Sequence, residues 1–320
     1  MVKFIISQND ENQRLDKFLR KYLKNASLSH IYKLIRKDVK VGGVREKPDR
    51  ILKSGDEITI YISAEDEDFL RGVRDIQKSK RQFGIAYEDK NILVVNKPFG
   101  LLIHGSPSEK KNTLTNQVVG YLIEKGEYDV SERTFSPAPV NRLDRNTTGL
   151  VVFGKTGQAL KDLGQMMKER NRIRKFYLTI VSGEIEGELF LKGELVKDSN
   201  TNKVSIFDWA SHGKEIETIA RVKSRARGFS LLEVEPVTGR THQIRAHLAH
   251  AGYPVIGDAK YGDSRLNRKI SEKYGLTTQL LHAEKLIFED MTPRFEYMTG
   301  IEIIAPPPGE FNRIKSEIFD

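Results

Sequence analysis

The chain has 320 residues, a hydrophobic fraction of 38% and a formal net charge of +9 at pH 7, which together suggest two ordinary domains and a polyanionic partner. It contains no cysteine, which excludes disulfides, thiolate metal sites and a cysteine nucleophile. No apolar run approaches the roughly 20 residues that cross a bilayer, and the N-terminus lacks the apolar core of a signal peptide, so we predict a cytoplasmic protein without a membrane partner.

Residues 1–62 have the pattern of a small separate domain. Apolar residues at helical spacing predict an amphipathic helix over 14–24, and a second helix is expected after the N-cap candidate Ser27. A glycine pair at 42–43 predicts a short hairpin, and alternating isoleucines predict a half-buried strand over 58–62.

Positive charge is concentrated in this N-terminal domain. Residues 1–62 hold 14 Lys and Arg against 8 Asp and Glu, a net of +6 (14 − 8) out of +9 for the whole chain. Such charges usually form a solvated helix face, but on two adjacent helices they would also form a phosphate-binding face. The cations expected on that face are Lys17, Arg20, Lys21, Lys33, Arg36 and Lys37.

Three segments of this domain resemble the S4 RNA-binding domain in their order and residues. They are Leu15–Leu19, Ile31–Lys37 and Gly55–Ile58. The resemblance implies that RNA is the partner of the basic face. The sequence departs from it at Gly43, where the S4 family commonly has Asn, so the hairpin is not expected to supply that contact.

A larger domain is expected over 84–320, after a linker over 63–83 that is charged and poor in large apolar side chains. Its β-branched runs outnumber the helical stretches near 157–169 and 241–251 and do not alternate with them regularly. We therefore predict an α+β domain on a mixed, largely antiparallel sheet, with an irregular tail or sheet edge at prolines 306–308. The strands are expected at 92–95, 150–153, 176–181, 218–222 and 230–237.

Residues 149–156 match the P-loop pattern letter for letter. A phosphate cradle needs a flexible loop whose amides turn toward one anion. The spacer residues 150–153 are Leu, Val, Val and Phe, which favour a buried strand that uses its amides in ladder hydrogen bonds. We therefore interpret the match as a coincidence.

Two polar segments precede or open expected strands. Residues 141–149 place Asp144 between Arg142 and Arg145, and nearby positive charge favours an ionised carboxylate. A surface turn with local ion pairs is the alternative interpretation. Tyr177 follows Lys and Phe at the start of a strand, a position that also suits simple packing.

A third polar segment, residues 238–247, ends a strand, turns, and enters a helix. Arg240 and the free amides of the helix start would hold a phosphate or a carboxylate. Thr241 and Arg245 are spaced to share one helix face.

Three histidines in or near this helix raise the question of a metal site. His242, His247 and His250 are separated by five and three residues, so only the last two would lie together. No carboxylate within the helix completes a set of ligands. We predict no metal.

The order of Arg142-Leu143-Asp144, then 175–177, then 239–245 is similar to that of the RluA-type pseudouridine synthases. So are the stretches 87–100, 252–262 and 281–283. With the S4-like domain in front, the resemblance covers nearly the whole chain and is greatest to synthases of large-subunit ribosomal RNA. It implies an isomerase that needs no cofactor and acts on RNA; a monomer is the default expectation.

The resemblance also implies a role for each site residue. Pseudouridine formation breaks the bond from C1′ to N1 and remakes it at C5, which calls for a nucleophile and a proton shuttle. Asp144 would be the nucleophile, Tyr177 the aromatic that stacks on uracil and helps remove the C5 proton, and Arg245 the partner of Asp144. Arg142 would fill the gap left when the target base leaves the stack. Residues implied to line the RNA side are Leu143, Arg240, Thr241, His242, Gln243 and Ile244.

Two departures from the family pattern concern Asn141 and Thr148, where His and Ser are usual. Asn still forms hydrogen bonds and Thr keeps the hydroxyl, so loop geometry and specificity are more affected than the nucleophile. The main alternative is a non-catalytic RNA-binding or ribosome-assembly protein. The joint presence of Asp144, Tyr177 and Arg245 speaks against it, because binding alone does not need a carboxylate facing polyanionic RNA.

Overall fold

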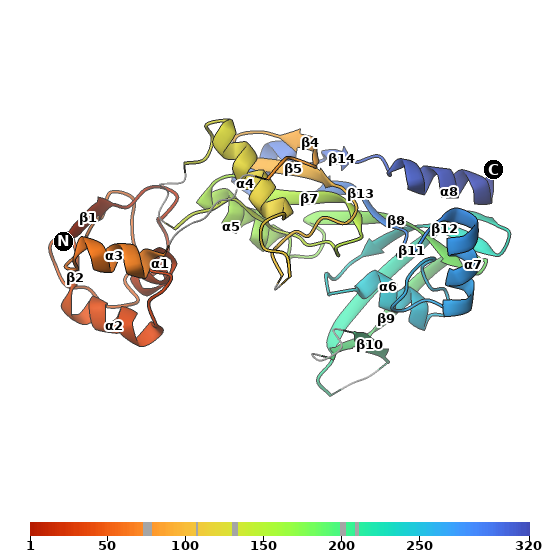
Figure 1. Cartoon of the computed structure of the whole chain (residues 1–320), viewed down its shortest axis with the longest axis horizontal. Helices are drawn as coiled ribbons and strands as arrows, with labels where there is room; N and C mark the ends of the chain where they lie inside the picture. The colour runs from red at the N-terminus through yellow and green to blue at the C-terminus, as the bar shows by residue number, and fades with distance from the viewer. Residues whose placement is uncertain (73–78, 107, 130–133, 199–202, 209–210) are drawn as a thin grey trace. The chain divides into compact units, whose positions relative to one another are not determined.

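The computed structural model of the chain describes residues 1–72, 79–106, 108–129, 134–198, 203–208 and 211–320. The chain forms two compact units (Figure 1). The first comprises residues 1–81, 115–138 and 154–161, and the second comprises residues 82–114, 139–153 and 162–320.

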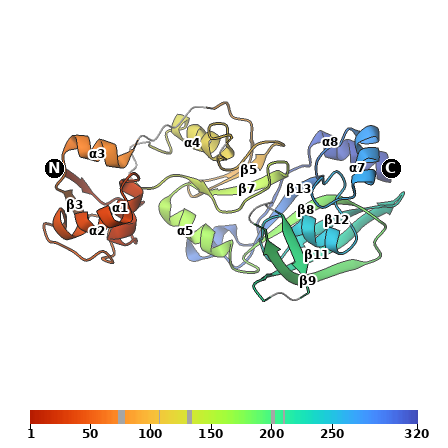
Figure 2. The same ribbon diagram turned by 60° about the horizontal axis from the view of Figure 1, so that its bottom comes forward.

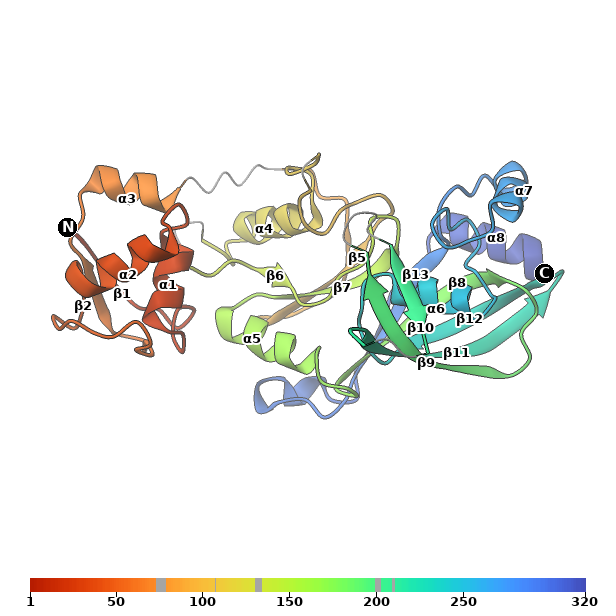
Figure 3. The ribbon, with the colours of Figure 1, turned by 90° about the horizontal axis from the view of Figure 1, so that it is seen from below.

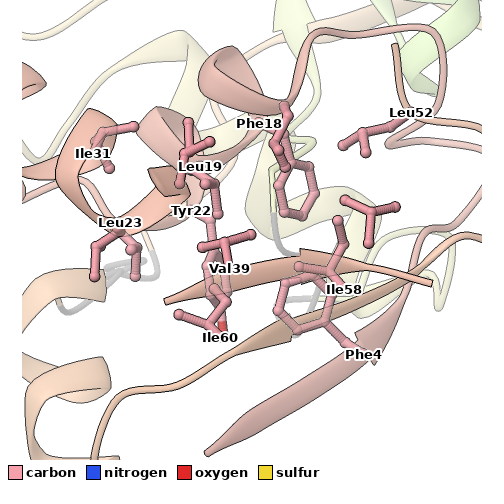
Figure 4. Packing of buried hydrophobic residues seen from close by; sticks show 14 of the residues in the cluster. Phe4, Phe18, Leu19, Tyr22, Leu23, Ile31, Val39, Leu52, Ile58 and Ile60 are labelled. Atoms are coloured by element: carbon pink, nitrogen blue, oxygen red, sulfur yellow. The ribbon is translucent and has the colours of Figure 1, made fainter. Parts of the chain in front are cut away.

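The N-terminal part of the first unit is a three-stranded antiparallel sheet in the order β1-β3-β2 with helices packed on it. Its elements are β1 (Val2–Ile5), α1 (Leu15–Tyr22), α2 (Leu28–Lys37), β2 (Val39–Val41), β3 (Glu57–Ile60) and α3 (Ala64–Arg71). Figure 4 shows Phe18 and Tyr22 of α1 pointing toward Ile58 and Ile60 of β3. The predicted helices and strand are therefore confirmed, although β3 ends at Ile60 and is buried on both faces over 58–60 rather than half-buried. Ser27 caps α2 by accepting a hydrogen bond from the amide of His30 at 3.3 Å.

Helix α3 lies in the segment that was predicted as a linker. Ser63 caps it by accepting a hydrogen bond from the amide of Asp66 at 3.0 Å, and Leu70 is buried in the same apolar core as Phe4. The segment looked like a linker because Leu70, the buried residue of α3, is surrounded by charged residues. Residues 73–78 of the predicted linker lie outside the described residues, and the predicted domain boundaries stay a prediction.

One mixed sheet forms the frame of the second unit (Figure 3), in the order β10-β9-β11-β12-β8-β13-β7-β5-β4, with β14 paired to β13 and β6 to β7. Neighbours from β10 to β13 run antiparallel, whereas β13 and β7 run parallel. This confirms the predicted α+β class. The strands are β4 (Gly84–Glu88), β5 (Ile92–Lys97), β6 (Ala138–Pro139), β7 (Thr148–Gly154), β8 (Ile173–Ser182), β9 (Glu188–Lys197), β10 (Val204–Phe207), β11 (Lys214–Ala226), β12 (Phe229–Pro236), β13 (Leu281–Phe288) and β14 (Glu302–Ile304).

Helices cover both faces of the sheet in the second unit (Figure 2). Ile244 and Leu248 of α6 pack with Tyr177 on one face, and α7 and α8 pack against Leu178 and Ile180 on the other. Successive strand residues point to opposite faces, so β8 contributes to both cores. The helices after residue 100 are α4 (Leu114–Glu124), α5 (Gly157–Met166), α6 (Gln243–His250), α7 (Ser264–Tyr274), the 3₁₀ helix η1 (Pro293–Met298) and α8 (Gly309–Phe319).

The C-terminal tail differs from its prediction. Residues after the three prolines form helix α8, and Phe311, Ile314 and Ile318 are buried along one side of it. The irregular segment predicted there ends at Pro308, which precedes the first helical residue. The three prolines led to the prediction of an irregular tail, and the helical spacing of the three apolar residues after them was overlooked.

The segment that matches the P-loop pattern contains the predicted strand. All seven residues of β7 are buried, including Leu150 and Phe153. Lys155, which would hold phosphate in a P-loop, is buried and paired with Glu127. The strand prediction is confirmed, and the geometry of the segment does not suit a phosphate cradle.

Candidate active site

Asp144 lies in the loop that leads into β7. Its side chain is 26% exposed, so a substrate can reach the carboxylate. The loop is tightened by a hydrogen bond from the amide of Thr147 to the carbonyl of Asp144 at 3.1 Å. Two residues later Gly149, with φ of +110°, approaches Ala283 of β13 so closely that an added Cβ would lie 2.1 Å from the Ala283 oxygen. Only glycine permits this approach, which brings the Asp144 loop to the strand next to β8.

Arg245 connects Asp144 to a second, fully buried carboxylate. Its Nη1 donates to Asp144 Oδ2 at 2.7 Å, while Nε and Nη2 donate to the two oxygens of Asp258 at 2.7 and 2.8 Å. Burial would lower the pKa of Arg245, but the bonds to Asp258 and the charge of Asp144 outweigh it and raise that pKa. Burial likewise acts to raise the pKa of Asp258, and the Arg245 hydrogen bonds overcome it and lower that pKa. The result is a fixed ion pair that aims the guanidinium at Asp144.

Tyr177 lies on β8 in the apolar cluster that also holds Leu143 and Ile244. The side chain is only 8% exposed. Burial, reinforced by the charge of Asp144, raises the pKa of Tyr177 well above its ordinary value, so the neutral phenol is the resting form. Leu143 and Ile244, predicted to line the RNA side, pack in this cluster, and their predicted contact with RNA stays a prediction.

His242 has an unusual backbone conformation at the start of α6. Its φ is +55°, in the left-handed region that residues other than glycine seldom adopt. Its Nδ1 lies 2.9 Å from the hydroxyl of Tyr261, and its Nε2 lies 3.8 Å from Asp144 Oδ1. Burial lowers the pKa of His242, so the ring faces Asp144 as a neutral imidazole at neutral pH.

Gln243 stabilises the turn before α6 from inside the protein. Its Oε1 accepts hydrogen bonds from the hydroxyl of Thr238 and the amide of Arg240, and its Nε2 donates to the carbonyl of Glu217 and the hydroxyl of Thr218. The side-chain amide of Gln243 therefore makes its hydrogen bonds to groups of the protein itself. Gln243 is therefore placed as a support of the turn, although it was predicted to line the RNA side.

Arg240 and Thr241 are both exposed in this turn. The helix begins only at Gln243, so Thr241 lies outside it, whereas Arg245 is buried within it. The expectation that Thr241 and Arg245 share a helix face is therefore wrong. The left-handed residue at 242 ends the periodicity on which that expectation relied.

A cavity of about 390 Å³ opens onto Asp144. Its lining residues are Asp144, Arg145, Asn146, Lys203, His242, Arg245, Ala259, Lys260, Thr277, Thr278 and Gln279. Three of the lining cations, Arg145, Lys203 and Lys260, lie outside the Asp144–Arg245–Asp258 ion pairs. Burial and the neighbouring charges of Arg245 and Lys203 lower the pKa of Lys260. Among the described lining residues the cations therefore outnumber the single carboxylate, Asp144.

Two further groups of predicted residues are Arg142 and the cations of the N-terminal domain. Arg142 is exposed beside Asp144 and does not line the cavity. The six cations of the N-terminal domain are all exposed on α1 and α2 of the first unit, as the basic-face prediction requires: Lys17, Arg20, Lys21, Lys33, Arg36 and Lys37.

Asn141 and Thr148, the two departures from the family pattern, both hold the frame of the Asp144 loop. The Asn141 amide donates to the carbonyl of Leu150 at 3.2 Å and accepts from the amide of Val152 at 2.9 Å. The Thr148 hydroxyl lies 2.8 Å from Nδ1 of the buried His282. Neither side chain contacts Asp144, which agrees with the expectation that they act on loop geometry.

Sequence reasoning missed Asp258, Lys97, Lys203 and Lys260. Asp258 is 13 residues beyond Arg245 and follows no periodicity, and its only signal was the match of the Gly257-Asp258 stretch to the family. The two cavity lysines are surface-type residues in loops, which no pattern distinguishes from other cations. Among the described residues, no group of three His, Asp or Glu is placed to hold a metal, and no helix is long and apolar enough to cross a membrane.

Lys97 is a fully buried ammonium group beneath the Asp144 loop. Its Nζ donates to the carbonyls of Pro98 and Arg145, each at 2.9 Å. Burial lowers the pKa of Lys97 from 10.5 to about 7, although the charge of Asp144 acts in the opposite direction. Lys97 therefore anchors the residue that follows Asp144.

Replacing Lys97 by Met is expected to change how stability depends on pH. The native protein releases the Lys97 proton near pH 7, whereas the unfolded chain keeps it up to about pH 10.5. Since the unfolded state binds more protons in this window, the free energy of unfolding gains a contribution that rises with pH between these values. In urea unfolding from pH 6.5 to 9.5, the free energy of unfolding should rise less steeply with pH for Lys97→Met than for the wild type. The variant should also lose roughly 1–3 kcal/mol of stability for each carbonyl left without a hydrogen bond. Parallel curves for the two proteins would contradict the prediction.

The sequence matches two known families. Residues 91–250 match RNA pseudouridylate synthase, and residues 13–58 match the S4 domain. The chain is 33% identical over 290 residues to ribosomal large subunit pseudouridine synthase C of Escherichia coli (strain K12), covering 88% of this chain and 87% of that protein. It is 32% identical to the Pasteurella multocida (strain Pm70) protein of the same name, covering 89% and 85%.

A solved structure shows the same fold. Human RNA pseudouridylate synthase domain containing 1 superposes with a TM-score of 0.56 at 23% identity, covering 72% of this chain and 87% of that one. At this identity the likeness supports the fold alone. The likeness agrees with the α+β sheet, and the S4 match agrees with the small N-terminal domain. The chain belongs to the RNA pseudouridylate synthase family.

Proposed function

We propose that this enzyme converts uridines of large-subunit ribosomal RNA to pseudouridine, with Asp144 as the nucleophile and the target base flipped into the cavity. The observation that carries the proposal is the ion-pair chain in which Asp258 holds Arg245 and Arg245 holds Asp144. The names of the relatives in Escherichia coli and Pasteurella multocida supply the RNA class.

The geometry suits a reaction on an extruded nucleotide. The reacting atoms are inaccessible in a base-paired helix, so the uridine has to leave the stack at a cost of a few kcal/mol. The cations Arg145, Lys203 and Lys260 at the cavity suit the phosphates that flank the uridine. We assign to the exposed Arg142 the place vacated by the base.

Tyr177 completes the proposed reaction. The ring stacks on uracil, and the phenol moves the C5 proton to N1, giving its own proton to N1 as it accepts the proton from C5. A relay suits a side chain whose raised pKa keeps it neutral at rest. The reaction rearranges one nucleotide without oxidation or reduction, so the proposal includes no cofactor.

The experiment that tests the function is a map of pseudouridines on unmodified large-subunit ribosomal RNA after incubation with the wild-type protein. New pseudouridines at defined positions are expected. Modification of transfer RNA alone would reject the proposed substrate class. RNA binding without modification would instead favour the non-catalytic binding protein. The proposal also takes the protein as a cytoplasmic monomer without a membrane partner, and light scattering would test the oligomeric state.

Neutralising the basic face of the N-terminal domain is expected to weaken RNA binding and its dependence on salt. Each phosphate contact contributes about 0.7–0.9 to the slope of log K against log salt. In the triple variant Arg20→Gln, Arg36→Gln and Lys37→Gln, the slope should fall by up to about 2–3, because all three side chains are exposed. The matched control replaces three exposed cations of α7, Arg265, Arg268 and Lys269, in the same way. Equal slopes for the two triple variants would contradict a phosphate-binding face on α1 and α2.

A further inference from the structure

Phe99 is an exposed aromatic side chain beside the Asp144 loop. It lies in the turn that follows β5, and 54% of its surface is exposed. A single exposed phenylalanine is ordinary on a protein surface. Its significance depends on what holds the turn and what surrounds it.

Hydrogen bonds on both sides of Phe99 fix this turn to the Asp144 loop. Lys97 Nζ joins the carbonyls of Pro98 and Arg145, and Arg145 Nε donates to the carbonyl of Gly100 at 3.1 Å. Gly100 has a φ of +75°, which glycine adopts at little cost. The aromatic ring is therefore presented on a turn that is ordered before any ligand arrives, which reduces the entropy lost on binding.

The turn that carries Phe99 is joined to the cavity through Arg145. Arg145 contacts this turn and also lines the cavity with Asp144. Arg142 is close enough to His104, five residues after Phe99, for its charge to help burial lower the pKa of that histidine. Exposed aromatic rings between cations are the usual platform for unpaired nucleic-acid bases, because the ring stacks on the base and the cations meet the phosphates.

We propose that Phe99 stacks on an unpaired RNA base next to the extruded uridine and so contributes to the choice of target site. The inference rests on the proposed function, since it takes RNA at the Asp144 cavity as given. A neighbouring base needs a new partner when the uridine leaves the stack, and the turn of Phe99 is bonded to Arg145, which lines the cavity that receives the uridine.

The first test compares the affinity of Phe99 variants for a short ribosomal RNA fragment that carries a mapped target uridine. Loss of a stacked base typically weakens binding by about 5- to 150-fold, and we expect this for Phe99→Ala and Phe99→Leu. Phe99→Tyr keeps the ring and should bind about as well as the wild type. Phe190→Ala removes another exposed phenylalanine, which lies on β9 and is 68% exposed, and should leave affinity unchanged.

The second test reads the contact itself and identifies the base. The chain has one tryptophan, Trp209, which lies outside the described residues. Because it is the only one, Phe99→Trp in a Trp209→Phe background carries a single tryptophan, at position 99. Its fluorescence should be quenched by the RNA. Each flanking nucleotide is replaced in turn by an abasic site. One of these replacements should weaken binding by the wild type, and the same replacement should not weaken binding by Phe99→Ala any further.

Two results separate failure of this inference from failure of the proposed function. Wild-type modification of the RNA with equal affinities for wild type, Phe99→Ala and Phe99→Leu would overturn the stacking role and leave the function standing. Absence of modification by the wild type would overturn the proposed function. The affinities and the quenching, measured on a fragment of whichever RNA the wild type binds, would then decide whether Phe99 contacts a base.

Discussion

Asp144→Asn is expected to abolish pseudouridine formation while leaving the fold and the RNA affinity nearly unchanged. The amide has the shape of the carboxylate and still offers an oxygen to Arg245 Nη1, so the cavity keeps its geometry. It cannot act as the nucleophile, and loss of a group that takes part directly in chemistry lowers the rate by at least about 10⁴-fold. Single-turnover assays on unmodified ribosomal RNA, with dissociation constants measured alongside, check both parts of the prediction.

Two controls make the Asp144 result specific. Asp144→Ala should be equally inactive, and it excludes activity regained by deamidation of asparagine. Asp290→Asn replaces an exposed aspartate whose φ of +43° asparagine also tolerates, and it should retain full activity. Turnover of Asp144→Asn within about tenfold of the wild type, a loss of about 1.4 kcal/mol or less in transition-state stabilisation, would remove Asp144 as nucleophile. A matched loss of RNA affinity would show instead that Asp144 acts in binding.

The frame of the second unit was predictable because its central strands are apolar. The runs 92–95, 150–153 and 176–181 form β5, β7 and β8, whose side chains are largely buried. By contrast β9, with the buried Leu195 between charged residues, faces solvent on much of its length and gave no signal. Pattern reasoning detects a strand by its run of apolar residues, so it also missed β13, which lies between β8 and β7 but carries Glu284 and Lys285 among its apolar residues.

Those residues of the candidate site that lie in short sequence motifs were predictable. Asp144, Tyr177 and Arg245 each lie in a short motif, and the structure brings all three together. Asp258 and Lys97 were missed because their roles depend on contacts across the fold, with Arg245 and with the carbonyl of Arg145. A sequence pattern records spacing along the chain and does not record which buried charges meet in space.

Asp258→Ala is expected to cause the largest loss of stability among single substitutions at the site. Asp258 is fully buried and takes two of the three hydrogen bonds that Arg245 donates to carboxylates. Removing one partner of a buried pair leaves an uncompensated charge and typically costs about 3–5 kcal/mol. Asp144→Ala removes the other partner of the same arginine, but its side chain is 26% exposed and water replaces it, so the loss there should be below about 1 kcal/mol. Urea unfolding of both variants measures the difference.

The same substitution should also slow catalysis in the fraction that remains folded. Without Asp258, the guanidinium of Arg245 is no longer fixed, and Asp144 loses the partner that aims it; a misplacement of about 1 Å can cost about 100-fold in rate. Arg245→Met combined with Asp258→Leu replaces the pair by apolar groups, which often restores stability. This double variant should be more stable than Asp258→Ala and yet as slow or slower. Full activity in the double variant would show that the ion pair serves only the fold, and the chain from Asp258 through Arg245 to Asp144 would have no part in the chemistry.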